Sequence, residues 1–181
     1  LPDSVSAEAP PARQQLGEAA VTWAAVSLAD KLDTVVGMFY AGEKPTGSRD
    51  PFGLRRQVHG IFKVLVDLRE LTGLSVRPAL WPLLEKAAEP FAVFSQWPEG
   101  AVKEMLAFLR ERYQHVLEQR GYDIRNVRAV ARLEDSPVDA KRKLEVLPEF
   151  TASPDFQKLA VAFKRVKNIA RELPDASSAV T

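Results

Sequence analysis

Cysteine is absent from this chain of 181 residues, and histidine occurs only twice. Without cysteine there is no disulfide, zinc thiolate or thiol nucleophile, and the composition suits a reducing compartment. No run of about 18 apolar residues could span a membrane, and the first residues lack the pattern of a signal peptide. We therefore expect a soluble, cytoplasmic protein, and the initial Leu1 suggests processing or a piece of something longer.

Residues that could build a catalytic site are also scarce. Neither His59 nor His115 is followed by Asp or spaced for a shared metal on a helix, so we interpret both as structural, with a ligand or base as the alternative. Asp30 and Asp33 share a helix face, but solvation or pairing with Lys31 explains them without a metal. There is no glycine-rich phosphate loop and no nucleophile elbow. These absences predict a chain without a complete active site.

What the sequence does contain is helical periodicity. Apolar residues recur at spacings of three and four, and no segment alternates as a strand would. The pattern predicts an all-α helical bundle with helices over residues 17–40, 51–71, 78–94, 98–120, 123–133, 137–148 and 154–174. In the last helix we expect five residues to face inward: Phe156, Leu159, Phe163, Val166 and Ala170.

The predicted helices group into two helical subdomains. Residues 1–15 are rich in proline and small side chains, which indicates a flexible lead-in. One subdomain would cover 16–73 and the other 78–174, joined by the short linker between them and followed by a tail at 175–181.

The connection between the first two helices is unusually rich in special residues, with the sequence KPTGSRDP over 44–51. Pro45 and Pro51 stiffen it, Gly47 allows a backbone angle that other residues resist, and Asp50 can cap a helix that has Pro51 as its first residue. Such a corner could bind phosphate, or it could be a polar connector. Its candidate binding residues are the cations Lys44, Arg49, Arg55 and Arg56.

The last helix is a second candidate surface. Lys164, Lys167 and Arg171 follow one edge at spacings of three and four, beside the apolar face. A contiguous edge of one sign suits a phosphate backbone, whereas a solvated face with cations near the helix C-terminus is the plainer interpretation. Because the net charge is only +1, any affinity for nucleic acid must come from such local patches.

Three segments go further than physical pattern. Residues 28–37 (LADKLDTVVG) and 44–56 (KPTGSRDPFGLRR) closely resemble the hallmark segment of the β subunit of bacterial heterotetrameric glycyl-tRNA synthetase, and 163–169 (FKRVKNI) is similar to a later family element. The resemblance implies the end of an HD-type helical domain followed by part of an anticodon-binding-like domain. It implies tRNA(Gly) and the α subunit as partners, with ATP and Mg²⁺ used by the α subunit and no cofactor in this chain.

The resemblance also exposes a departure. An HD-type metal phosphohydrolase needs upstream histidines and a His-Asp pair, which this chain lacks, so Asp30 is at most a vestige of a metal site. The leading hypothesis is therefore a non-catalytic part of glycine–tRNA ligase that binds tRNA and supports assembly. A purely structural helical module and a degenerate phosphohydrolase remain the alternatives.

Overall fold

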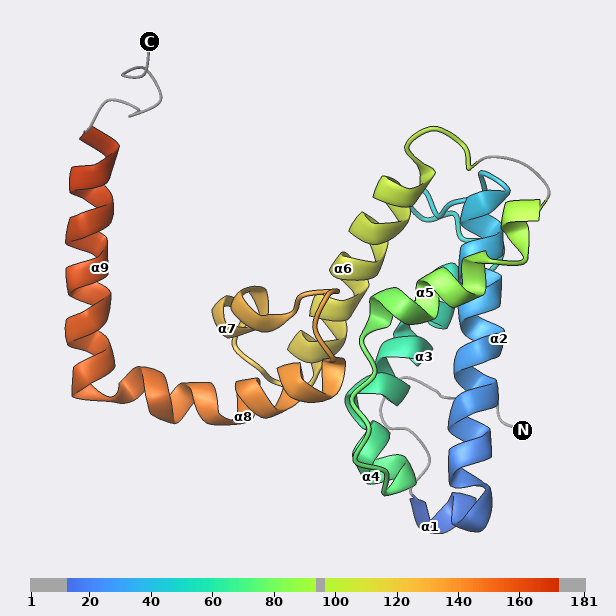
Figure 1. The fold of residues 1–181 in the computed structure, drawn as a ribbon, viewed down its shortest axis with the longest axis horizontal. Helices are drawn as coiled ribbons and strands as arrows, with labels where there is room; N and C mark the ends of the chain where they lie inside the picture. Colours follow the sequence, from blue (N-terminus) through green and yellow to red (C-terminus); the bar gives the residue numbers. More distant parts are fainter. Residues whose placement is uncertain (1–12, 94–96, 173–181) are drawn as a thin grey trace. The chain divides into compact units, whose positions relative to one another are not determined.

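The computed structural model describes residues 13–93 and 97–172 (Figure 1). Within these ranges there is no strand, and the bridge between Thr46 and Arg49 is isolated. The predicted all-α class is confirmed. The elements are α1 (Arg13–Leu16), the 3-10 turn η1 (Gly17–Ala19), α2 (Ala20–Tyr40), α3 (Leu54–Val66), α4 (Leu68–Thr72), α5 (Leu80–Ala88), the 3-10 turn η2 (Phe91–Val93), α6 (Ala101–Gln119), α7 (Ile124–Val130), α8 (Pro137–Ala152) and α9 (Pro154–Glu172).

The chain divides into two compact units, the first ending at Leu144 and the second beginning at Glu145, within α8. The linker predicted after residue 73 lies inside the first unit, where α2 contacts α3 before it and α5 after it. The division into subdomains 16–73 and 78–174 stays a prediction. None of the helices in the described residues is long and apolar enough to cross a bilayer.

The core of the first unit lies where α2, α3 and α6 meet, and α5 packs on α2 (Figure 1). Most of the buried apolar residues of these helices lie in this contact, whereas Val102 of α6 is 37% exposed. The rings of Phe62 and Tyr113 stack at a centroid distance of 4.4 Å. Each large aliphatic side chain buried in this way contributes about 1.5–3 kcal/mol. Fully buried members are Val35, Val36, Val58, Ile61, Leu65, Leu109 and Leu117.

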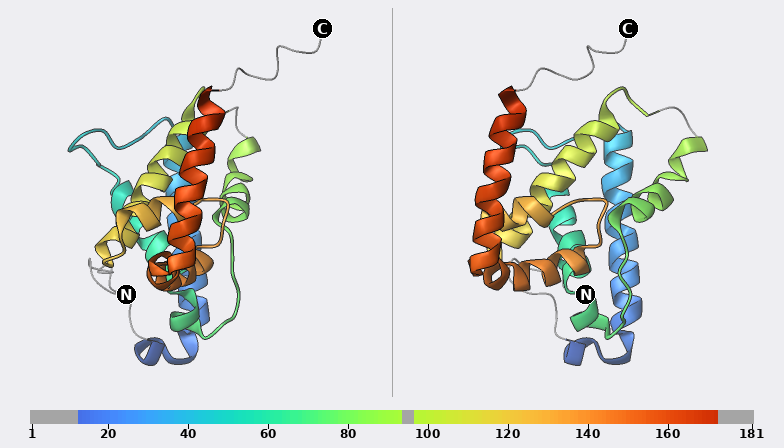
Figure 2. Two further views of the ribbon diagram at one scale, coloured as in Figure 1. Left: turned by 90° about the vertical axis from the view of Figure 1, so that its left-hand side faces the viewer. Right: turned by 60° about the vertical axis from the view of Figure 1, so that its left-hand side comes forward.

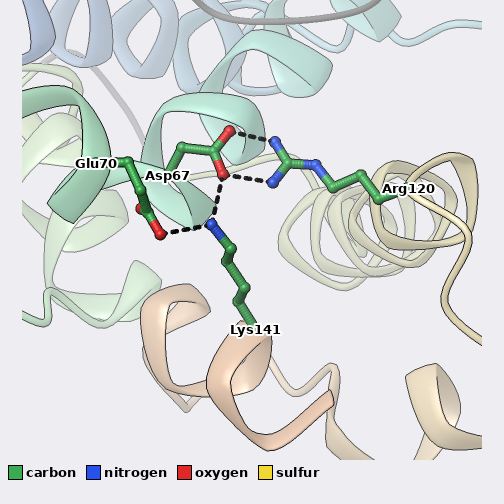
Figure 3. A network of polar contacts seen from close by, with 4 residues as sticks. All are labelled: Asp67, Glu70, Arg120 and Lys141. Atoms are coloured by element: carbon green, nitrogen blue, oxygen red, sulfur yellow. Dashed lines mark hydrogen bonds and ion pairs between the residues drawn. The ribbon is translucent and has the colours of Figure 1, made fainter. Parts of the chain in front are cut away.

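The helix predicted over residues 51–71 is interrupted at Asp67, which separates α3 from α4. The backbone there leaves the helical region, with φ −104° and ψ 16°. The Asp67 carboxylate accepts two hydrogen bonds of 2.6 Å from the Arg120 guanidinium and one of 3.1 Å from Lys141 Nζ. Lys141 also donates to Glu70 at 2.7 Å (Figure 3). The interruption places this carboxylate between the end of α6 and the start of α8.

Proline was a poor guide to one helix end and a good guide to another. Pro148 was expected to end its helix but lies inside α8, which continues to Ala152. A proline removes one N–H donor and crowds the preceding turn, which weakens a helix without always ending it. Pro154 begins α9 as predicted, and Ser153 Oγ accepts from the backbone N–H of Phe156 at 3.3 Å.

The apolar face of α9 was predicted to face inward, and this prediction is wrong for most of its residues. Phe156 is half-buried and its ring contacts Phe150 at 5.1 Å. Leu159, Phe163 and Val166 are 63–66% exposed, and Ala170 is exposed as well. An amphipathic stripe shows only that one face is apolar, whereas burial needs a neighbouring element. The second unit offers α9 only the end of α8 among its described residues.

Candidate functional site

The connection between α2 and α3 begins with a tight stop of α2 and projects beyond the helices that it joins (Figure 2). Gly42 adopts φ +79°, its N–H donates to Phe39 O at 3.1 Å, and the N–H of Glu43 donates to Met38 O at 2.8 Å. This pair of bonds is a Schellman cap, which satisfies carbonyl groups at the helix end. Gly42 therefore sets the direction in which the loop leaves α2.

The tip of the loop is closed by its own backbone. Thr46 and Arg49 exchange backbone hydrogen bonds of 3.0 and 2.7 Å, and Gly47 between them has φ +49°. From the first turn of α3, the Arg55 guanidinium donates to Gly47 O at 2.6 Å. The tip is thus held by its own backbone and by the Arg55 side chain.

Asp50 satisfies the start of α3, but from a greater distance along the chain than predicted. Its two carboxylate oxygens accept from the backbone N–H groups of Leu54 at 2.8 Å and Arg55 at 3.0 Å. The helix does not begin at Pro51, however, because residues 50–53 form a turn in which Gly53 adopts φ +64°. The carboxylate reaches across this turn to the first helical N–H groups.

The structure assigns different surroundings to the four candidate cations of the loop. Lys44 Nζ forms an ion pair of 2.5 Å with Glu104 of α6, and Arg55 binds the loop backbone as described. The side chains of Arg49 and Arg56 are exposed, and neither has a hydrogen bond or ion pair with the described residues. Arg49 and Arg56 are therefore the loop cations that remain available to a ligand.

A cavity of about 370 Å³ adjoins the same turn, between α2 and the start of α3. One glycine allows a cation to approach it closely: a Cβ on Gly60 would lie 2.8 Å from Lys31 Cε. The Arg56 side chain lines the cavity beside Gly53. Its lining residues are Lys31, Asp50, Pro51, Phe52, Gly53, Arg56, Gln57 and Gly60.

Sequence reasoning missed this cavity and its residues Lys31, Phe52 and Gln57 as a site. One signal was present, because a glycine inside a helix costs about 1 kcal/mol relative to alanine and often marks a close approach. Gly60 lies within α3 and is such a residue. The signal indicates that something passes close by, without saying that it is Lys31.

The cations of the last helix lie in the second unit. Lys164, Lys167 and Arg171 are all exposed on α9, beside its exposed apolar face. They form no ion pair with the described residues. Their role as binding residues stays a prediction.

The two histidines, far apart in sequence, meet between α3 and α6 with ring centroids 6.5 Å apart. Burial and the charge of Lys63, followed by His115, Arg120 and Arg112, lower the pKa of His59 to about 4. Its imidazole is therefore neutral at neutral pH. The arrangement favours a structural role for the two histidines, in the packing of α3 against α6, over a role as a metal ligand or base.

The two carboxylates considered as metal ligands do not belong to a group of possible metal ligands in the part of the chain that the structure describes. Asp30 and Asp33 are both exposed on α2, and the nearest cation to Asp30 is Lys31 at 3.9 Å. Among the described residues no three His, Asp or Glu side chains come together in a way that could hold a metal ion.

Comparison with known proteins covers most of this chain. Residues 8–132, which include the loop and the cavity, match the family profile described as glycyl-tRNA synthetase beta subunit. A glycine–tRNA ligase beta subunit of Geobacter metallireducens is 40% identical over 152 residues, covering 83% of this chain and 21% of that protein. One of Aromatoleum aromaticum is 37% identical over 155 residues, covering 85% and 21%. The chain thus spans about a fifth of the length of these curated relatives.

Proposed function

The chain belongs to the glycyl-tRNA synthetase beta subunit family, and on this premise we propose that it is a non-catalytic, tRNA-binding part of a cytoplasmic glycine–tRNA ligase. In this role it supports attachment of glycine to tRNA(Gly). Its partners are tRNA(Gly) and an α subunit that activates glycine with ATP and Mg²⁺. The first unit then includes the end of an HD-type domain, and the later helices belong to an anticodon-binding-like domain.

The observation that carries this proposal is the unequal use of the loop cations. Lys44 and Arg55 hold the loop in place, while Arg49 and Arg56 are exposed on the rigid corner that results. Holding a cation on a stiff backbone lowers the entropy lost when it binds phosphate. Guanidinium groups also match phosphate oxygens through paired hydrogen bonds. The cations of α9, Lys164, Lys167 and Arg171, would supply a second contact with RNA.

A purely structural role is the second candidate, and the same contacts favour it in part. The ion pair between Lys44 and Glu104 ties the loop to α6, and Asp50 ties it to α3. If the loop only orients helices, changes at these residues lower stability while changes at Arg49 leave RNA binding intact. The degenerate phosphohydrolase has no observation in its favour among the described residues.

Charge reversal at Arg49 in the assembled two-subunit ligase separates these roles. We expect Arg49→Glu to lower kcat/KM for tRNA about tenfold or more, since a charged hydrogen bond is worth about 1.5–3 kcal/mol. The KM for glycine should stay unchanged. The isolated chain should also bind tRNA(Gly) in a salt-sensitive manner.

Arg69→Glu is the matched control, because Arg69 is an exposed arginine on α4 that has no ion pair with the described residues. The proposal requires this variant to charge tRNA like the unaltered enzyme. Normal charging by a folded Arg49→Glu, Arg56→Glu double variant would establish the structural role instead.

A further inference from the structure

The cavity between α2 and the start of α3 has a size that limits its occupant. Its volume is about 370 Å³, near the lower end of the range of about 300–1,000 Å³ found for small-molecule sites. A stem of RNA cannot enter such a space. A single nucleotide or a comparable small anion can.

The lining of the cavity favours a negative charge. Lys31 reaches it across Gly60 with a side chain only 20% exposed, and Arg56 reaches it from the first turn of α3. The nearest acid to Lys31 Nζ is Asp30 at 3.9 Å, and Asp30 is itself 69% exposed, so this pair is weak. A partly buried lysine beside a free arginine suits a phosphate.

Asp50 is the acid in the lining, and its charge is already engaged. Both of its oxygens accept backbone N–H groups from the start of α3. The positive ends of these N–H dipoles offset part of its repulsion of an anion. They also mean that the helix N–H groups are occupied, so the binding groups are the side chains of Lys31 and Arg56.

An aromatic ring and an amide complete the lining. Phe52 is 46% exposed at the cavity, although a phenylalanine ring usually gains by burial. Exposed aromatic rings are the platforms on which proteins stack unpaired bases. Gln57 adds a donor and an acceptor that suit the edge of a base.

We propose that this cavity holds one unpaired nucleotide of the bound RNA, with its phosphate against Lys31 and Arg56 and its base against Phe52. The proposal rests on the proposed function, because it assumes that this corner of the protein binds RNA. It goes further in assigning the cavity, Lys31, Phe52 and Gln57 to one flipped or terminal nucleotide rather than to the outer backbone of a helix.

The test uses the 181-residue chain with a single-stranded RNA oligonucleotide, AMP and inorganic phosphate as separate probes. Lys31→Met keeps an unbranched side chain of similar shape over Gly60 and removes the ammonium group. We expect it to raise the Kd for the oligonucleotide about tenfold. It should also make the salt dependence shallower: the slope of log binding constant against log salt concentration should become less negative by about 0.7. That is the value for one phosphate contact on a single strand.

A second variant tests the contact with the base, and a third serves as the control. Phe52→Ala should raise the Kd about tenfold without changing the salt slope, because stacking on a base is worth roughly 1–3 kcal/mol and involves no counterion. Lys103→Met is the matched control, since Lys103 is exposed on α6 and does not line the cavity. It should leave the Kd and the slope unchanged. Circular dichroism confirms that each variant keeps its helices.

The outcomes separate this inference from the proposed function. If Lys31→Met and Phe52→Ala bind the oligonucleotide like the unaltered chain while Arg49→Glu binds it weakly, the cavity proposal is wrong and the proposed function stands. If the unaltered chain binds no RNA, both are wrong. If AMP or inorganic phosphate binds as tightly as the oligonucleotide, and Lys31→Met weakens its binding to the same extent, the cavity is a site for a free anion and the RNA assignment is overturned.

Discussion

Helices α3 and α9 carry apolar stripes of the same kind, yet one stripe is buried and the other exposed. In α3, Val58, Ile61 and Leu65 are fully buried, because α2 and α6 both contact this helix. In α9, Leu159 and Phe163 are 64% and 66% exposed. The comparison teaches that a stripe specifies which face of a helix is apolar, while the elements around the helix decide whether that face contributes to stability.

The sharpest way to test this contrast is to truncate one leucine in each helix. Leu65→Ala should lower the free energy of unfolding by about 2–5 kcal/mol, because it leaves a cavity in a packed core. Leu159→Ala should change it by less than about 0.5 kcal/mol, as at other exposed positions. Urea denaturation followed by circular dichroism measures both. Equal losses would show that α9 is packed against something in solution.

The charged contacts of the two units allow a second comparison. Asp67 is 13% exposed on its side chain and serves two cations, whereas Asp155 is 95% exposed and pairs with Lys158 at 3.5 Å. Asp67→Asn should cost about 3 kcal/mol, because it leaves partly buried Arg120 without its countercharge and Lys141 with Glu70 alone. Lys158→Met should cost less than about 0.5 kcal/mol.

The urea midpoints of Asp67→Asn and Lys158→Met measure these two losses of unfolding free energy. The same free energy loss in both would mean that the network of Figure 3 is as well solvated as a surface pair. The pKa of Lys141 is shifted upward although burial alone would lower it, since Glu70 and Asp67 favour its charged form. Lys141 should therefore stay protonated throughout the neutral range and keep this network closed.

Titration of His59 probes the contact between α3 and α6. Within the described residues, helix α9 has no comparable contact with another helix along its apolar face. The pKa of His59 is about 4 in the folded chain against an ordinary value of 6.5. As the pH is lowered, His59 therefore binds a proton at a higher pH in the unfolded chain than in the folded one. Stability should therefore fall as the pH is lowered from 6.5 to 4, and this contribution should level off below 4. Above pH 6.5 both states are neutral and His59 has no effect.

His59→Gln isolates that contribution from the carboxylates, which titrate in an overlapping range. The unfolding free energy of the unaltered chain should fall relative to that of His59→Gln as the pH is lowered through this window. The groups facing His59 are Lys63 on α3 and Arg112, His115 and Arg120 at the other side of the contact. A constant difference from pH 7 to pH 4 would contradict the lowered pKa.

Much of the fold was predictable, because helix periodicity and helix starts are local properties. The helix predicted over residues 17–40 and the start of α9 at Pro154 follow from neighbouring residues. The interruption at Asp67 was not predictable, since Arg120 and Lys141, which bind its carboxylate, lie 53 and 74 residues further along the chain. The exposure of α9 was missed for the same reason, as no local pattern reports the neighbours of a helix.

The candidate site divides in a similar way. The stiffness of the loop followed from Pro45, Gly47 and Asp50, whose backbone roles are short-range. The different surroundings of its four cations did not, because Lys44 pairs with Glu104, which is 60 residues away. The cavity required α2 and α3 to be placed side by side, and only Gly60 hinted at that contact. Local chemistry thus indicated the corner, and tertiary packing identified which of its charges are free.

The smallest expected effect compares the caps of the same two helices. Asp50→Ala removes the acceptor for two backbone N–H groups of α3 and should lower the unfolding free energy of the first unit by about 1 kcal/mol. Asp50→Asn, which retains one acceptor oxygen, should cost less. Ser153→Ala removes a longer bond of 3.3 Å at the start of α9, and should reduce helix content at low temperature while leaving the urea midpoint of the first unit unchanged. A shift of that midpoint in Ser153→Ala would show that α9 unfolds together with the first unit, so the contrast between a supported and an unsupported helix would no longer hold.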